Sequence, residues 1–315
     1  MSETYEAIQK FIDEYENVVK KEEMKKKISQ FCQENRNRSI IIITSGRTVV
    51  PLEKKTVRYI SNFSTGRRGA LCTEELFKKS SDYAVIYFHH KHAIKPFSWK
   101  SLYKEDDIMD EIELTDKGFI KFKNQSNELK DHITMSKDVK SKNKLLEVPF
   151  NTLFEYLILL KEITSMVNQS HGKKGIIFAS AAVSDFYIPM KNLAENKIQS
   201  RDHHELHLKL KPTPKMLLAL RNKWAPDLFC VGFKLETDEG ILMEKVQSAQ
   251  EKYGIHLTVA NILGKHRHQV IMVPNKKLSK EEPTEYKIDE ESKCKKIETY
   301  IIDHVLSKHQ HYLNS

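Results

Sequence analysis

The feature that most constrains this fold is an alternation of short, continuously apolar segments with amphipathic helical segments. The apolar segments are rich in β-branched residues, as in Ser39–Thr44, which is typical of strands buried on both faces of a parallel sheet. This alternation favours an α/β fold with a doubly wound, mostly parallel, Rossmann-like sheet flanked by helices. We predict strands at 39–44, 83–88, 175–183, 228–234, 256–261 and 268–273, and helices at 67–80, 152–167, 214–223, 240–253 and 290–307.

Two segments stand outside this alternation. Residues 1–37 carry apolar side chains at helical spacing and contain no glycine or proline, which predicts one or two helices. Residues 91–150 are highly charged, contain one glycine, and show a strand-like patch only at 118–122. We therefore expect one domain over residues 1–315, with an N-terminal helical extension at 1–37 and a charged insertion at 91–150 that makes few buried contacts.

Charge and cysteine content disfavour several classes of protein. The net charge is +9, but lysine is spread along the chain and no nucleic-acid-binding motif accompanies it, so we expect no nucleic-acid partner. No apolar run approaches the ~18 residues that a membrane-spanning helix needs, so we expect no membrane partner. The four cysteines are scattered without a C-x-x-C pair, which favours free thiols and a cytoplasmic location.

Several common catalytic motifs are missing. The glycines form no G-x-G-x-x-G, and there is no Walker A, H-E-x-x-H or G-x-S-x-G sequence. An NAD-dependent dehydrogenase is therefore disfavoured, although the sheet would permit one. The pairs His89–His90 and His203–His204 lack a cysteine or carboxylate at metal-binding spacing, so we predict no metal ligands and interpret both pairs as surface-loop histidines.

Four polar segments are predicted at the carboxyl ends of strands, where ligands bind in open α/β sheets. The first is 44–53, and the second is 62–69, which runs directly into a helix. Hydroxyl groups and bare amides at a helix N-terminus can hold a phosphate. The alternative is an ordinary helix cap by Ser64 or Thr65. Because two glycines and two arginines in one turn exceed what a cap requires, we interpret the second segment as phosphate-binding.

The third and fourth segments each leave an alternative open. The third is 180–187, followed by 197–200, and its small residues would let a ligand approach the backbone. Asp185 could accept hydrogen bonds from a ligand, although an aspartate at a strand end is as often a cap or turn residue. The fourth is 232–237 with 260–263 downstream, where Phe233 either packs in the core or stacks on a base.

In order and spacing, these segments resemble the phosphopantothenoylcysteine synthetases. The resemblance runs from about residue 39 to residue 275 and is weakest over 91–150. The third segment begins with Ser180, where the family has alanine. The chain carries no attached decarboxylase flavodomain, and in this it resembles the eukaryotic branch of the family. The six matching sequences are TSGRT with VPLE, VRYISNFSTGRRGA, SAAVSDFY, KIQS, FKLET and VANIL.

The resemblance implies a two-step ligation in coenzyme A biosynthesis. Members of the family first convert 4′-phosphopantothenate to an acyl-nucleotide and release pyrophosphate, because a free carboxylate is a poor electrophile. The amine of L-cysteine then displaces the nucleoside monophosphate. Eukaryotic-type members generally use ATP and bacterial members CTP, both with Mg²⁺, and the resemblance also implies a homodimer. Preorganised hydrogen-bond donors should supply most of the rate in both steps.

Residue roles follow from the same motif match. Asn62 would donate to the oxyanion at the acyl centre, and Lys197 would neutralise phosphate charge from what resembles a mobile flap. Arg67 and Arg68 are further phosphate-contact candidates. The resemblance places Asn62, Ala181, Ala182 and Asp185 at the substrate, and Gly46, Ser64, Gly66, Arg67, Gly69, Phe233 and Asn261 at the nucleotide.

Arg47 is a departure from the family pattern, which usually has a second glycine at this position. An arginine places a side chain where the backbone normally passes close to the ligand. Either the side chain points outward or it reshapes the site. We expect Arg47→Gly to be tolerated, because the family pattern indicates that glycine fits this turn; the opposing hypothesis is that Arg47 has become a phosphate ligand.

Two other functions compete with a ligase. One is a Rossmann-like oxidoreductase that binds NAD, and the other is a non-catalytic regulatory relative. The presence of Asn62, Asp185 and Lys197 speaks against both, because neither alternative needs these three side chains.

Overall fold

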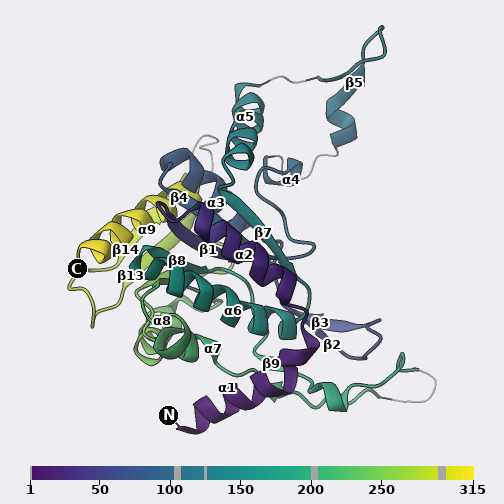
Figure 1. Cartoon of the computed structure of the whole chain (residues 1–315), viewed down its shortest axis with the longest axis vertical. Coiled ribbons are helices and arrows are strands. Elements are labelled where there is room, and N and C mark those ends of the chain that lie inside the picture. Colours follow the sequence, from purple (N-terminus) through teal and green to yellow (C-terminus); the bar gives the residue numbers. More distant parts are fainter. Residues whose placement is uncertain (1, 103–107, 124–125, 200–204, 290–295) are drawn as a thin grey trace.

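A central sheet of eight strands organises the described part of the molecule (Figure 1). The computed structural model describes residues 2–102, 108–123, 126–199, 205–289 and 296–315. The strand order is β14-β13-β12-β11-β8-β1-β4-β7, parallel except that β13 and β14 are antiparallel to their neighbours. The strands are β1 Ser39–Ser45, β4 Tyr83–His90, β7 Leu145–Phe150, β8 Gly175–Ala179, β11 Phe229–Glu236, β12 Leu257–Ile262, β13 Gln269–Pro274 and β14 Thr284–Lys287.

Helices cover both faces of this sheet, which confirms the predicted doubly wound α/β fold. Alternate residues of β1 explain the two layers, since Ile40 and Ile42 pack in the core under α1, α2, α6 and α7, whereas Ile41 and Ile43 pack under α3 and α9. The helices are α1 Ser2–Tyr15, α2 Glu22–Glu34, α3 Arg67–Lys79, α4 Trp99–Leu102, α5 Asn127–Ser141, α6 Leu153–His171, α7 Met216–Ala219, α8 Glu239–Tyr253 and α9 Ile297–Asn314.

The charged segment at 91–150 differs from its prediction at its C-terminal end. Residues 145–150 form β7, an edge strand paired with β4, so part of the expected insertion belongs to the main sheet. Lys144, Glu147 and Pro149 disguise this strand in the sequence, but an edge strand tolerates both charge and proline. The hairpin of β5 Ile112–Leu114 and β6 Ile120–Phe122 stands away from the sheet (Figure 1), and β6 lies within the patch predicted as strand-like.

Other elements also differ from the predictions. Strand β8 ends at Ala179, four residues before the predicted end, so that residues 180–183 leave the sheet as a loop. Helix α9 begins at Ile297, and residues 290–295 of the predicted helix lie outside the described residues. Two small antiparallel pairs were not predicted: β2 Val49–Pro51, within the first polar segment, pairs with β3 Tyr59–Ser61, and β9 Phe186–Tyr187, at the end of the third, pairs with β10 Lys211–Pro212.

Candidate functional site

The first two polar segments lie against each other at the carboxyl end of β1. Ser45 Oγ donates to the carbonyl oxygen of Gly66 at 2.9 Å. Gly46 and Gly66 have φ angles of +86° and +79°, a region that side chains with a Cβ rarely adopt. A Cβ on Gly66 would also lie 2.7 Å from Ala93 Cβ, so both conformation and space require glycine there. The result is a tight double loop, formed by the first two polar segments, in which both glycines are buried.

The start of α3 is the part of this double loop that can receive an anion. Gly66 is the N-cap residue, and no side chain caps the helix. The hydroxyl groups of Ser64 and Thr65 accept from the amides of Gly66 and Arg67 at the long distances of 3.3 and 3.4 Å, so the ordinary capping alternative is weakly supported. The first turn of α3 holds no acidic side chain, and its amides and dipole therefore favour an anionic ligand.

The remaining motif residues of α3 serve its packing. A Cβ on Gly69 would lie 2.5 Å from Ser45 Oγ, so glycine at this position lets the helix approach β1. Arg68 Nη1 binds Glu298 Oε1 at 2.9 Å, and its Nη2 donates to the carbonyl oxygen of His266. Its guanidinium is thus engaged in holding α3 to α9, which makes Arg68 a poor phosphate-contact candidate.

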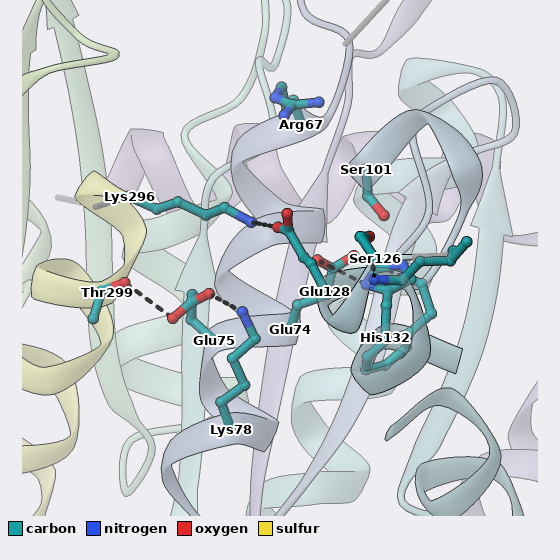
Figure 2. Close-up of polar contacts among 12 residues, drawn as sticks. Arg67, Glu74, Glu75, Lys78, Ser101, Ser126, Glu128, His132, Lys296 and Thr299 are labelled. Carbon is teal, nitrogen blue, oxygen red and sulfur yellow. Dashed lines mark hydrogen bonds and ion pairs between the residues drawn. The ribbon is translucent and has the colours of Figure 1, made fainter. Parts of the chain in front are cut away.

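Arg67 lies at the opposite end of α3 from the ion pair of Glu75 and Lys78 (Figure 2). Its Nη1 donates to the carbonyl oxygen of Lys100 at 2.8 Å, so the arginine also contacts the segment that follows β4. Lower on α3, Glu75 accepts from Thr299 Oγ1 at 2.9 Å and pairs with Lys78 at 2.7 Å (Figure 2). These contacts fix the helix whose N-terminus forms the double loop.

The third segment is joined to the first by backbone hydrogen bonds. Ala182 donates its amide to the Gly46 carbonyl at 2.8 Å, and Thr48 donates its amide to the Ala182 carbonyl at 3.1 Å. Thr44 Oγ1 accepts from the Ala181 amide at 3.0 Å. Early termination of β8 makes these contacts possible, because residues 180–183 must bend across the end of β1. Three of the four predicted segments therefore form one connected unit.

Asn62 and Asp185 lie at the borders of this unit. The half-buried Asn62 places its side-chain amide nitrogen 3.4 Å from the Val183 carbonyl oxygen, between the second and third segments. A primary amide there can donate a hydrogen bond without adding charge. Asp185 is exposed, and its carboxylate pairs with Lys215 Nζ at 2.8 Å.

Lys197 is exposed, and its segment is attached through Glu53 rather than through the glycine loops. The Glu53 side chain is completely buried and accepts from Arg58 Nη1 at 2.8 Å and from the Arg58 amide at 2.9 Å. Arg58 Nη1 also donates to the Ile198 carbonyl at 2.9 Å. Burial would raise the pKa of the Glu53 carboxyl, but these hydrogen bonds outweigh it and lower the pKa. Ser200, the last residue of this motif, lies outside the described residues.

The fourth segment lies two strands from β1, on β11 and β12. Phe233 is half-buried and packs edge-on against Phe178 with ring centroids 4.8 Å apart, so one side of the ring belongs to the core. Asn261 is buried and donates to the Val259 carbonyl at 3.1 Å. Its Oδ1 has no hydrogen-bond partner among the described residues, and this buried acceptor suits an amino group of a ligand.

The histidine prediction is wrong for the pair that the structure describes. His89 and His90 are the last residues of β4 and are 1% and 3% exposed, because the strand continues two residues beyond its predicted end. His203 and His204 lie outside the described residues. Among the described residues, no group of three or more His, Cys, Asp or Glu side chains could hold a metal ion.

The sequence assigned no role to two supporting side chains. Glu53 was placed in the first polar segment, and its position directly after the apolar run 49–52 was the signal for a supporting role. Tyr87 had none, because it lies inside an apolar strand. Its hydroxyl lies 2.8 Å from Ser45 Oγ and 2.7 Å from the Ile94 carbonyl, so it supports the double loop from below. A cavity of about 650 Å³ between the start of α2 and β7 is lined by none of the predicted site residues.

The chain is similar to several known proteins. The family model of the DNA/pantothenate metabolism flavoprotein C-terminal domain matches residues 156–308. Phosphopantothenate–cysteine ligase 2 of Oryza sativa subsp. japonica is 40% identical over 235 residues, 74% of this chain and 71% of that protein. Phosphopantothenate–cysteine ligase of Homo sapiens is 32% identical over 288 residues, 88% of each. A Cab2 mutant solved in complex with phosphopantothenate-cysteine has a TM-score of 0.81 at 32% identity, with 93% of this chain and 94% of that chain covered.

Proposed function

We infer the chemistry of this chain from the family to which it belongs, the phosphopantothenate–cysteine ligases. The protein is a ligase of coenzyme A biosynthesis that condenses 4′-phosphopantothenate with L-cysteine and consumes a nucleotide. The observation that carries this conclusion is the joining of the first three motif segments into one hydrogen-bonded unit at the carboxyl end of β1. Such a unit can hold a nucleotide and an acyl substrate side by side.

We propose that the reaction passes through an acyl-nucleotide. An oxygen of the phosphopantothenate carboxylate attacks the α-phosphorus of the nucleotide, and pyrophosphate leaves as the bridging phosphorus–oxygen bond breaks. The cysteine nitrogen then attacks the acyl carbon, loses a proton, and expels the nucleoside monophosphate as the acyl carbon–oxygen bond breaks. The uncapped N-terminus of α3, with Gly46, Ser64, Gly66 and Gly69 around it, supports phosphate binding in the first step.

Asn62 and Lys197 are proposed as the catalytic residues. Asn62 would donate to the oxyanion that forms on the acyl oxygen when cysteine attacks, and its place between the second and third segments supports this role. Lys197 would neutralise charge on the phosphates during activation. Its exposure requires its segment to move over the site, and that segment is held at its base by Glu53 and Arg58.

The substrate and nucleotide sites follow the same division. Ala181, Ala182 and Asp185 are proposed to contact phosphopantothenate, with Ala182 bonded to the Gly46 loop and Asp185 exposed beside it. Phe233 and Asn261 are proposed to contact the base, which we expect to be adenine because the chain resembles eukaryotic-type members. The unpaired Oδ1 of Asn261 would accept from the base amino group. Mg²⁺ would accompany the nucleotide phosphates.

We also propose a homodimer in the cytoplasm. Phe63, next to Asn62, is 94% exposed, and a partner subunit would cover this large apolar side chain beside the acyl centre. Cys32, Cys72 and Cys230 are buried free thiols, which fits a reducing compartment. Among the residues that the structure describes, no helix is long and apolar enough to cross a membrane.

Product analysis tests this proposal. The purified protein is incubated with 4′-phosphopantothenate, Mg²⁺ and either ATP or CTP, with and without cysteine, and the nucleotide products are separated by chromatography. We expect cysteine-dependent release of AMP and pyrophosphate, with ATP preferred over CTP. Stoichiometric ADP and phosphate would show an acyl-phosphate route and would overturn the acyl-nucleotide mechanism.

A further inference from the structure

Two buried nitrogen atoms beside the Gly46 loop lack hydrogen-bond partners. Arg47 Nε and His90 Nε2 are both buried, and neither has a partner among the described residues. His90 lies directly under the loop, since a Cβ on Gly46 would be 2.9 Å from His90 Cβ. Buried polar groups are nearly always paired in folded proteins, so two unpaired nitrogens at one loop point to an absent third group.

Both of these nitrogens are hydrogen-bond donors. The Nε of an arginine always carries a hydrogen. His90 Nδ1 accepts from the His92 amide at 3.3 Å, which leaves the ring hydrogen on Nε2. Burial, with the nearby Arg47 guanidinium acting in the same direction, lowers the pKa of His90 to about 4 despite an opposing contact with the Asn151 side chain, so the ring is neutral near pH 7. The group that completes this site must therefore be an acceptor.

The charge around the donors favours an anionic acceptor. Among the described residues Arg47 forms no ion pair, whereas many other basic side chains of the chain do. Lys91 and His92 also lie close enough to lower the pKa of His90. The positive charge of Arg47 is therefore left without a carboxylate partner in the part of the chain that the structure describes.

The backbone at Arg47 removes the main reason to expect glycine there. Arg47 is not among the residues with positive φ, so a Cβ at this position causes no conformational strain. Its backbone forms a parallel bridge with Ala182 and lies between the Gly46 loop and the third segment. The arginine therefore sits where the nucleotide and phosphopantothenate sites meet.

We propose that Arg47 and His90 form an oxyanion-binding subsite that receives a phosphate group of one of the two phosphorylated substrates. The subsite deepens the proposed ligase function and rests on it for the identity of those substrates. Arg47 supplies the charge and one donor, and His90 supplies a second, neutral donor from the end of β4. Either the nucleotide triphosphate or the phosphate of phosphopantothenate could provide the oxyanion, and separate binding measurements distinguish them.

The test is isothermal titration calorimetry of the full chain with three ligands: pyrophosphate, a non-hydrolysable ATP analogue, and 4′-phosphopantothenate. The variants are Arg47→Gln, which removes the charge and keeps a polar side chain, and His90→Leu, which removes the ring donor. His90→Gln is the matched control, because its side-chain amide can still donate from a similar position. Urea unfolding midpoints establish that each variant is folded.

We expect Arg47→Gln to weaken binding of one substrate class at least tenfold and to leave the other within twofold, which identifies the source of the phosphate. His90→Leu should weaken the same ligand, and His90→Gln should restore part of the loss. The double variant should lose less than the product of the two single losses, because both donors serve one oxyanion. If Arg47→Gln and His90→Leu both bind all three ligands within twofold of the wild type, the subsite does not exist.

These measurements distinguish a failure of the proposed subsite from a failure of the proposed ligase function. A wild-type chain that binds the ligands but releases no AMP in the presence of cysteine would refute the proposed ligation, whereas a loss of binding in the variants would still establish the subsite. A wild-type chain that turns over normally but has variants with unchanged affinity would refute the subsite alone. Wild-type protein that binds none of the three ligands would overturn the subsite directly.

Discussion

Gly66→Ala tests whether the double loop depends on close contact between its glycines and Ala93. The new Cβ would lie 2.7 Å from Ala93 Cβ and 3.0 Å from Ser45 Oγ, and the residue would keep φ near +79°. A left-handed conformation costs an alanine about 1–2 kcal/mol. Overpacking adds about 1–3 kcal/mol, because a methyl group attached directly to the backbone cannot rotate away. We therefore expect a loss of about 2–5 kcal/mol in the free energy of unfolding.

Gly254→Ala is the matched control for the conformational part of this cost. Gly254 caps α8 at φ +65°, and a Cβ there meets nothing within 4 Å. Urea unfolding should therefore show a loss of about 1–2 kcal/mol for Gly254→Ala and a larger loss for Gly66→Ala. Adding Ala93→Gly should return part of the stability of Gly66→Ala, since it removes the nearest atom. Equal losses for the two alanine variants, with no coupling to Ala93→Gly, would refute the contact.

Four further predictions concern catalysis, pH and assembly. Asn62→Asp should let the acyl-nucleotide form and accumulate, detected by mass spectrometry after acid quench, and near-normal turnover would mean that Asn62 only supports the turn. Lys197→Gln should slow pyrophosphate release in the first step by about 10²–10³-fold, and an unchanged burst rate would remove its assigned role. Because the pKa of Glu53 is lowered in the folded state, its contribution to stability should be present above the ordinary glutamate pKa of 4.5 and be lost as pH falls below that value. The stability advantage of wild type over Glu53→Gln, measured by urea unfolding, should shrink in that range, and a constant difference would contradict the assignment. Sedimentation at micromolar concentration should show a dimer, and a monomer alone would count against the proposed homodimer.

Much of the fold could be predicted because its signals are local. The run Ser39–Thr44 is apolar at every position between its polar ends, and a segment that must be buried on both faces has few alternatives to a central parallel strand. The predicted helix at 152–167 begins where it should because Thr152 and Glu155 form a capping box within one turn. Strand β7 escaped prediction because Glu147 and Pro149 interrupt its apolar pattern, which an edge strand tolerates.

The motif glycines divide in the same way. The sequence alone placed Gly46, Gly66 and Gly69 at strand ends and helix starts, since turn chemistry depends on adjacent residues. It could not separate their tasks. Gly46 and Gly66 have positive φ angles, which favour glycine. Gly69 lies inside α3, and glycine is required there because a Cβ would collide with the Ser45 side chain.

Long-range contacts decided what the polar side chains do. Arg67 and Arg68 are adjacent in the sequence, yet Arg68 turns to Glu298 on α9 while Arg67 contacts Lys100. His89 and His90 were predicted to lie in a loop, but two extra residues of strand pairing with β1 and β7 bury them, and His90 lies against Gly46, close enough to Arg47 for the guanidinium to lower its pKa. The sequence determined which segments become strands, turns and helix starts, because these depend on neighbours along the chain. The tertiary structure decided which side chains form hydrogen bonds or ion pairs within the protein and which keep an unpaired donor for a ligand. These outcomes depend on partners that folding brings from distant parts of the chain.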